Sequence, residues 1–276
     1  MALTAANGPF SEQPFGRFNV EIDRSGPILF WDPVPQRVRA IVADETLVDS
    51  DAVMLLHETG SLPIYYFRES DVRRELLEPS AKTVDSPAKG TARYWSIRIG
   101  ERLIPDAVWE YPDPVDAASF LAGHLALEWD AVDEWFVEGE QVFGHPRDPY
   151  ARIDVYNTTR HVRVLRDGVV LADTRRAKVL FETVLPPRYY IPPEDVRTDL
   201  LEPSPKITRC AYKGAASYWN VRVGDRLVAD LVWSYPNPQH DGEPVRGLFC
   251  FFNERVDLEL DGVVQERPTT QYSRND

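Results

Sequence analysis

Two stretches of the chain decide its fold: KGTARYWSIRIGERLIPDAVWEYPDP at Lys89–Pro114 and KGAASYWNVRVGDRLVADLVWSYPNP at Lys213–Pro238. They align without a gap at a shift of 124 residues, and the same shift aligns DVRRELLEPSAK at Asp71–Lys82 with DVRTDLLEPSPK at Asp195–Lys206. From Val38 onward, about 34 of 77 aligned positions are identical. Repetition at one fixed, domain-sized period indicates a tandem duplication of a whole domain rather than a solenoid.

The repeat divides the chain into two domains with short ends. We predict an N-terminal extension at 1–17, a first copy at 18–147, a second copy at 148–272 and a tail at 273–276. Two similar copies in one chain are expected to pack as a pseudo-twofold pair, like the subunits of a homodimer. Any higher oligomeric state stays open.

Within a copy, the pattern is mostly that of β-strands. Asp-Gly turns between alternating segments predict hairpins at Val162–Thr174 and Val256–Glu266, and a third hairpin turns at Gly100 within Arg93–Trp109. Acidic residues at the start and a proline at the end predict a short helix over SDVRRELLEPS, and another is expected at Asp116–Gly123. The fold class is therefore mainly β, either all-β or β-dominated α+β, with two small sheets per copy.

Alternation along the strand RYWSIRIG separates a core face from a polar face. Trp95, Ile97 and Ile99 point to one side and form the expected core face, whereas Tyr94 and Arg98 point to the other. The second copy keeps this division, with Tyr218 and Arg222 on its polar face.

Composition limits the function classes. The formal net charge of −13 argues against general binding to nucleic acids or anionic membranes. No signal peptide and no apolar run of membrane-spanning length are apparent, which favours the cytoplasm. The two cysteines, Cys210 and Cys250, form no CxxC motif, and the histidines show no ligand spacing, so we expect no disulfide framework, no metal and no cofactor.

The chain resembles the family catalogued as domain of unknown function 427 over nearly its whole length, twice. The matching motifs are the tyrosine pair with its DVR and LLEPS segment, CAYKG (210–214), ASYWNVRVG (216–224), VWSYP (232–236), and the GH (123–124) that precedes VDEWF (132–136). The resemblance implies a compact, mainly β domain and no known reaction. The family is also catalogued as nucleotidyltransferase-like, but the chain has neither paired Asp residues for two metals nor a phosphate-cradling glycine-rich loop.

Lysine is the most informative residue type. Only five of the 31 basic residues are lysine, and four of these five stand at equivalent positions in the two copies: Lys82 with Lys206, and Lys89 with Lys213. Lys89 and Lys213 precede a glycine, where a compact ammonium fits and a guanidinium would not. They are candidates for an anion-binding or carbonyl-activating amine. The alternative is a structural ion pair with a glutamate of the LLEPS segment, Glu78 or Glu202.

Two further candidates occur in one copy each. Cys210 lies three residues before Lys213, whose charge would favour a thiolate, whereas the first copy has Ser86 there. His124 of the first copy is replaced by Leu248 in the second. Either a composite site joins His124 to Cys210 and Lys213 across the copies, or both half-sites are degenerate.

Aromatic side chains near these residues suggest a small-molecule pocket. The candidates for its lining are the Tyr and Arg residues of the two copies: Tyr65, Tyr94, Arg98 and Tyr111, with Tyr189, Tyr218, Arg222 and Tyr235. We therefore expect a protein that handles a small molecule; an enzyme of unassigned reaction in specialised metabolism is one form that this function can take, and whether the protein is an enzyme stays open. The alternative is a non-catalytic binding or scaffold module in which the same residues hold the domain together.

Overall fold

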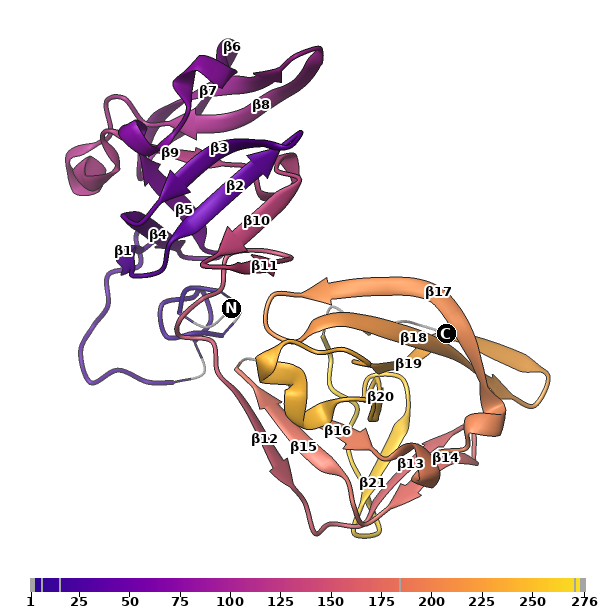
Figure 1. Ribbon diagram of the computed structural model, residues 1–276. Coiled ribbons are helices and arrows are strands. Elements are labelled where there is room, and N and C mark those ends of the chain that lie inside the picture. Colours follow the sequence, from indigo (N-terminus) through magenta and orange to yellow (C-terminus); the bar gives the residue numbers. More distant parts are fainter. Residues whose placement is uncertain (1–2, 6, 15, 184, 271, 274–276) are drawn as a thin grey trace. The chain divides into compact units, whose positions relative to one another are not determined.

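The computed structural model describes residues 3–5, 7–14, 16–183, 185–270 and 272–273. Parts of the predicted extension (residues 1–2, 6 and 15) and most of the predicted tail (274–276) lie outside the described residues. The chain divides into two compact units, residues 1–150 and 151–276 (Figure 1). Each unit contains a seven-stranded and a four-stranded antiparallel sheet, which confirms the mainly β class with two sheets per copy.

The seven-stranded sheet of the first unit has the order β1-β4-β5-β9-β8-β7-β6, and its four-stranded sheet has the order β11-β10-β2-β3. The strands are β1 (Leu29–Val34), β2 (Val38–Val42), β3 (Glu45–Ser50), β4 (Val53–Glu58), β5 (Ile64–Arg68), β6 (Leu77–Ser86), β7 (Gly90–Ile99), β8 (Arg102–Glu110), β9 (His124–Leu127), β10 (Glu134–Val137) and β11 (Glu140–Val142). The 3-10 helices are η1 (Glu69–Asp71), η2 (Arg74–Leu76), η3 (Asp116–Leu121) and η4 (Trp129–Ala131).

The second unit repeats this arrangement, with sheet orders β12-β15-β16-β20-β19-β18-β17 and β14-β13-β21-β22. Its strands are β12 (Ile153–Asn157), β13 (Val162–Arg166), β14 (Val169–Thr174), β15 (Lys178–Glu182), β16 (Arg188–Ile191), β17 (Leu201–Cys210), β18 (Gly214–Val223), β19 (Arg226–Ser234), β20 (Phe249–Phe251), β21 (Asp257–Leu260) and β22 (Val263–Val264). Its 3-10 helices are η5 (Pro193–Asp195), η6 (Thr198–Leu200) and η7 (His240–Val245).

The hairpin predictions are confirmed. β13 pairs with β14 around Asp167-Gly168, β7 pairs with β8 around Gly100, and β21 pairs with β22 around Asp261-Gly262. Asp167 and Asp261 have positive φ values of 49° and 53°, and the glycines that follow them are also positive. Two successive left-handed residues are what a two-residue hairpin turn requires.

The helix predicted over SDVRRELLEPS is wrong. The segment forms two single 3-10 turns, η1 and η2, and LLEPS enters β6, so Pro79 lies inside a strand instead of ending a helix. The reason is that the neighbouring strand takes the backbone hydrogen bonds: the amide of Arg73 donates to the carbonyl of Leu47 at 2.9 Å. The predicted helix at Asp116–Gly123 is present as the 3-10 helix η3.

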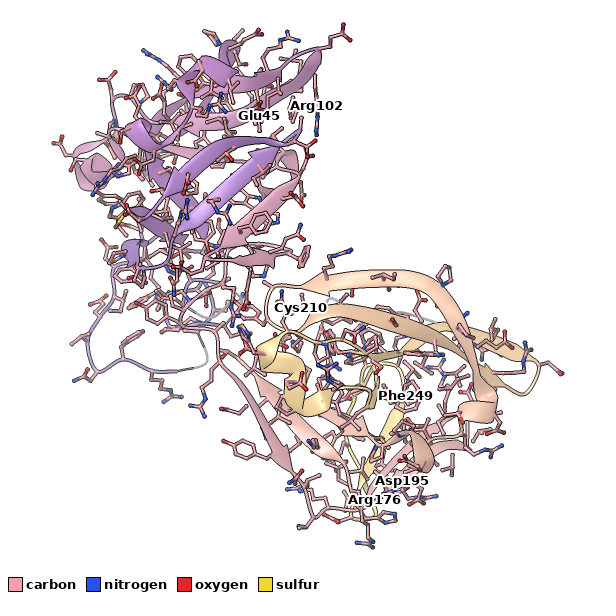
Figure 2. All side chains as sticks on the ribbon, viewed as in Figure 1. Glu45, Arg102, Arg176, Asp195, Cys210 and Phe249 are labelled. Carbon is pink, nitrogen blue, oxygen red and sulfur yellow. The ribbon has the colours of Figure 1, made fainter. Side chains whose placement is uncertain are left out.

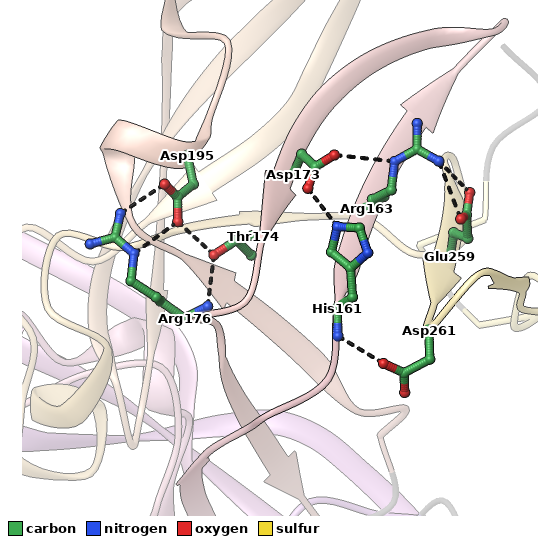
Figure 3. Close-up of polar contacts among 8 residues, drawn as sticks. All are labelled: His161, Arg163, Asp173, Thr174, Arg176, Asp195, Glu259 and Asp261. Carbon is green, nitrogen blue, oxygen red and sulfur yellow. Dashed lines mark hydrogen bonds and ion pairs between the residues drawn. The ribbon is translucent and has the colours of Figure 1, made fainter.

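The Asp of the DVR motif anchors these turns. In the second copy, Asp195 accepts from the hydroxyl of Thr174 at 2.6 Å and forms an ion pair with Arg176 at 2.7 Å (Figure 3). The first copy has the corresponding bond from Ser50 to Asp71 at 2.7 Å. The motif that first revealed the repeat therefore fastens η1 or η5 to the end of β3 or β14.

Each seven-stranded sheet has two differently used faces. The inner face packs against the four-stranded sheet and forms the main core, with Ile97 and Val221 fully buried. The outer face carries a second cluster of tyrosines and tryptophans, over which η3 or η7 places Leu121 or Val245. Among the described residues, no helix is long and apolar enough to cross a membrane.

Candidate functional site

A buried ion pair lies at the same place in both copies. Lys89, in the turn after β6, pairs with Glu58 at the end of β4, and Lys213 pairs with Glu182 at the end of β15. The exposed fractions of these side chains are 12% and 17% in the first copy, and 7% and 16% in the second. The predicted lysine partners, in contrast, were wrong.

The predicted partners, Glu78 and Glu202, form ion pairs with arginines instead. Glu78 pairs with Arg98 at 3.0 Å, and Glu202 pairs with Arg222 in the same way. Both pairs form across neighbouring strands at the surface. The lysines instead lie at the far ends of those strands, next to β4 and β15.

The glycine after each lysine explains the position of the lysine. Gly90 and Gly214 have φ values of +100° and +88°, and a Cβ atom on either would lie 3.0 Å from backbone atoms of the loop that follows β8 or β19. The same loops donate to the lysine carbonyls: the amide of Val115 to Lys89 at 3.2 Å, and the amide of Gln239 to Lys213 at 3.1 Å. Left-handed geometry and close approach both require glycine here.

The ammonium of Lys213 is charged at neutral pH. Burial by itself lowers the pKa of Lys213, but the nearby carboxylate of Glu182 and then the thiol of Cys210 raise it, and the net shift is upward. A protonated amine cannot attack a carbonyl group. The position therefore supplies a fixed positive charge and hydrogen-bond donors rather than a nucleophile.

Tyrosines surround each ion pair on the outer face. Tyr66 and Tyr190 accept hydrogen bonds from the indoles of Trp109 and Trp233 at 3.3 and 3.2 Å. Burial raises the pKa of both phenols far above the usual range. These groups stay neutral at physiological pH and can serve as hydrogen-bond donors and acceptors.

The predicted residues Tyr111 and Tyr235 belong to the same groups. Burial, with the carboxylate of Glu58, raises the pKa of Tyr111 to about 12, and burial raises the pKa of Tyr235 well above its usual value. The Lys89 ammonium lies 5.8 Å from the ring centre of Tyr111. In the first copy, the predicted lysine and this tyrosine therefore lie together, and in the second copy Glu182, the partner of Lys213, contributes to the raised pKa of Tyr235.

The second pair of lysines meets the predicted tyrosines of the polar strand face. Lys82 lies 4.1 Å from the ring centre of Tyr94, and Lys206 lies 4.6 Å from that of Tyr218. Here β6 and β17 each carry a bulge. The hydroxyl of Ser80 or Ser204 donates to Asp106 of β8 or Asp230 of β19, two strands away. Cation–π contacts of this kind orient the ring at the rim of the outer face.

Four predicted lining residues do not join these groups. Arg98 and Arg222 form the surface ion pairs with Glu78 and Glu202. Tyr65 and Tyr189 point to the inner face, where they pack in the core between the sheets. Successive side chains on a strand alternate, so Tyr65 and Tyr66 cannot share a face.

Cys210 and His124 lie near the outer-face residues of their own copies. Cys210 ends β17, with its sulfur 3.5 Å from the amide nitrogen of Tyr212 (Figure 2). His124 begins β9 and packs edge-on against Trp31, with ring centres 5.3 Å apart. The composite site that would join them across the copies stays a prediction. Among the described residues, no group of three or more His, Cys, Asp or Glu is placed to hold a metal ion.

The second copy adds a buried ion pair that the first copy lacks. Arg188 makes two 2.7 Å hydrogen bonds to Glu254, with exposed side-chain fractions of 6% and 0%. The guanidinium lies 5.6 Å from the ring of Trp233 and 5.9 Å from that of Phe252. At the position equivalent to Arg188, the first copy has Ile64.

The first copy fills its outer face differently. Trp31 packs against Tyr66 and Phe120, in each case with ring centres 5.3 Å apart. The second copy has Val155 and Pro244 at the positions of Trp31 and Phe120. The second copy therefore has smaller side chains than the first at both of these positions.

A shallow cleft of about 450 Å³ adjoins the ion pair of the first copy. Its lining includes Ala88, which precedes Lys89, and Leu29, which pairs with Glu58 in the sheet. The other lining residues are Asp23, Ser25, Gly26, Pro27, Ile28, Pro87 and Ala117.

A separate histidine is buried beside two carboxylates in the first unit. His57 of β4 is fully buried, with Nε2 3.8 Å from Asp32 and Nδ1 4.0 Å from Asp148, and neither nitrogen makes a hydrogen bond to any of the described residues. Burial lowers the pKa of His57, and Asp148 and Asp32 oppose this only in part. The equivalent residue of the second copy is Phe181.

Sequence reasoning missed the carboxylates of the site. Glu58 and Glu182 are themselves equivalent across the copies, so searching the repeat for shared acidic residues would have found them. Arg188 has Ile64 as its counterpart, so the same search would not have found it, although Glu254 is matched by the acidic Asp130.

Comparison with known proteins identifies the family and nothing finer. No protein of curated function matches the chain. The family model for a domain of unknown function, DUF427, matches residues 31–138 and again residues 154–262. These ranges correspond to the two copies and cover most of the chain, and the chain therefore belongs to the DUF427 family, as a tandem pair of its domains.

Proposed function

We propose that the second copy is a non-catalytic module that binds a small molecule on the outer face of its seven-stranded sheet. The observation that carries this proposal is the buried Arg188–Glu254 ion pair, whose guanidinium lies near the rings of Trp233 and Phe252. The first copy builds the same sheet order with Ile64 at the arginine position, so the fold itself does not need the pair.

Energetics favour function over stability for this pair. Removing two charges from water costs several kcal/mol per ion, by order of magnitude, and well-packed apolar residues often serve the fold equally well. The first copy has apolar Ile64 at the arginine position and Asp130 at the glutamate position, so it keeps an acidic residue but no buried pair. We infer that the second copy gains something other than stability from adding the arginine. Recognition of a ligand is such a gain.

The chemistry of the face suits binding better than catalysis. Lys213 is protonated, and burial raises the pKa of Tyr190 and Tyr235 well above the usual range, so no free base or nucleophile arises from them. Burial also raises the pKa of the Cys250 thiol far above neutrality. Flat rings beside two ion pairs are suited to an aromatic molecule that carries a polar group.

The test uses anilinonaphthalene sulfonate, a fluorescent aromatic anion, as the probe. The double variant Arg188→Met/Glu254→Gln removes both charges together and leaves no unpaired one. We expect the probe to bind the wild-type protein and to bind this variant at least tenfold more weakly.

The matched control is Arg197→Met/Asp199→Asn, which removes an exposed ion pair of the same copy. It should bind the probe as the wild type does. Equal affinity of the wild type and the Arg188→Met/Glu254→Gln variant, with both folded by circular dichroism, would reject the proposed site.

A further inference from the structure

The C-terminal segment of the chain runs back onto the second unit after its last strand. Gln265 donates its amide to the carbonyl of Leu258 at 2.7 Å, and Arg267 pairs with Asp257 at 2.7 Å. The described residues beyond form a tight turn, in which the amide of Ser273 donates to the carbonyl of Thr270 at 3.0 Å. The segment is thus held to β21 at Gln265 and Arg267, and Thr270 and Ser273 are hydrogen-bonded to each other within the turn.

This turn contacts the residues of the proposed binding face. The hydroxyl of Thr270 donates to Glu254 at 2.6 Å, on the carboxylate oxygen that also accepts from Arg188. The ring of Tyr272 lies 5.6 Å from that of Phe252, and the Arg188 guanidinium lies 6.0 Å from its centre. Tyr272 is also close enough to contribute to the raised pKa values of Lys213 and Tyr218.

The first copy offers no counterpart to this contact. Its residues equivalent to Arg188 and Phe252 are Ile64 and Glu128, and the residue equivalent to Tyr272 is Asp148. A ring at that place would find neither a guanidinium nor an aromatic partner. The aromatic turn therefore occurs in the one copy whose outer face carries the added ion pair.

We propose that the described residues 265–270 and 272–273 belong to an autoinhibitory strap, in which Tyr272 and Thr270 occupy the place of a ligand at Arg188 and Glu254. This inference rests on the proposed function, because it concerns the same face. A ligand then binds only when the strap has left, and the affinity measured for it is reduced by the fraction of molecules that are open. The strap also indicates the ligand class: a flat ring over Arg188 and Phe252, with a polar group directed at the ion pair.

The attachment is of a kind that can open. Tyr272 remains 39% exposed, so its ring covers the face without being enclosed by it. The turn is held to the face by a hydrogen bond from Thr270 and by the contacts of the Tyr272 ring with Phe252 and Arg188, whereas the sheet below is paired strand by strand. Segments with few buried contacts open locally at low free-energy cost.

The experiment measures binding of anilinonaphthalene sulfonate to full-length protein carrying Tyr272→Ala. If the strap is closed in about nine molecules of ten, opening it permanently tightens apparent binding about tenfold. The matched control is Tyr156→Ala, which removes a phenol that is 53% exposed on β12 and whose ring packs against Phe181. Thermal unfolding of each variant checks that the fold is retained.

Each result decides the matter. Tighter binding by Tyr272→Ala, unchanged binding by Tyr156→Ala and loss of the gain on adding Arg188→Met/Glu254→Gln support the strap. Unchanged or weaker binding by Tyr272→Ala overturns it, and the proposed function still stands if Arg188→Met/Glu254→Gln weakens binding. If Tyr272→Ala still tightens probe binding when Arg188→Met/Glu254→Gln is also present, the probe binds elsewhere, and both the strap and the proposed binding face are overturned. Absence of probe binding to the wild type and to every variant also overturns both.

Discussion

Because Lys213 and Glu182 form a buried ion pair, we predict that removing one of the two charges destabilises the second unit far more than removing both. Lys213→Met leaves the carboxylate of Glu182, whose side chain is 16% exposed, without its cation. Lys213→Met/Glu182→Gln removes both charges and keeps the shapes of the side chains. We expect the single variant to destabilise the second unit strongly and the double variant to recover most of the loss.

The magnitude follows from the burial of the pair. Removing one partner of a buried pair costs about 3–5 kcal/mol, because the remaining ion is neither solvated nor paired. Replacing both partners is close to neutral on the same scale. For a unit of this size, a loss of about 3 kcal/mol lowers the melting temperature by roughly 10 °C.

The pair also has a pH signature. The pKa of Lys213 is raised in the folded protein, so its contribution is fully present below the pKa of an unfolded lysine, about 10.4, and is lost as the pH rises through the folded value. Wild-type protein should therefore lose stability above pH of about 10.4 more steeply than the double variant. Groups common to both proteins cancel in this difference.

Calorimetry is the suitable assay, because we expect the two compact units, each with its own core, to unfold in separate transitions. Lys89→Met is the matched variant in the first unit, and it should shift the other transition. The reasoning is refuted if Lys213→Met alone leaves the melting temperature within about 2 °C of wild type, which is less than 1 kcal/mol. It is also refuted if the double variant is no more stable than the single one.

Two further predictions concern single side chains. Because the pKa of His57 is lowered by burial, its contribution to stability is present above about pH 6.5 and is lost as the pH falls below that. His57→Phe, which introduces the residue found at Phe181, should make the free energy of urea unfolding of the first unit less dependent on pH between about pH 5 and 6.5. An unchanged dependence of this free energy on pH would argue against this role. Asp195→Ala removes the acceptor of Thr174 and should cost about 1.5–3 kcal/mol, seen as a lower melting temperature of the second unit, with an unchanged transition as the contrary result.

Much of the architecture follows from local patterns. The 124-residue repeat, the Asp-Gly turns and the alternation around Trp95 and Ile97 are visible without any long-range contact. The Lys-Gly dipeptides at Lys89 and Lys213 also mark the candidate site, because a left-handed residue in close contact leaves a glycine in the sequence. The turns and the alternation of faces depend on residues that are neighbours in the chain.

What only the tertiary structure decided are the partners and the faces. Lys89 meets Glu58, 31 residues away, because β4 and the β6–β7 turn come together at one end of a sheet whose strand order is not sequential. The DVR segment became single turns because β3 took its hydrogen bonds. The duplication is thus determined by the sequence alone, whereas the binding face and its strap depend on strand order and register, which local patterns do not encode.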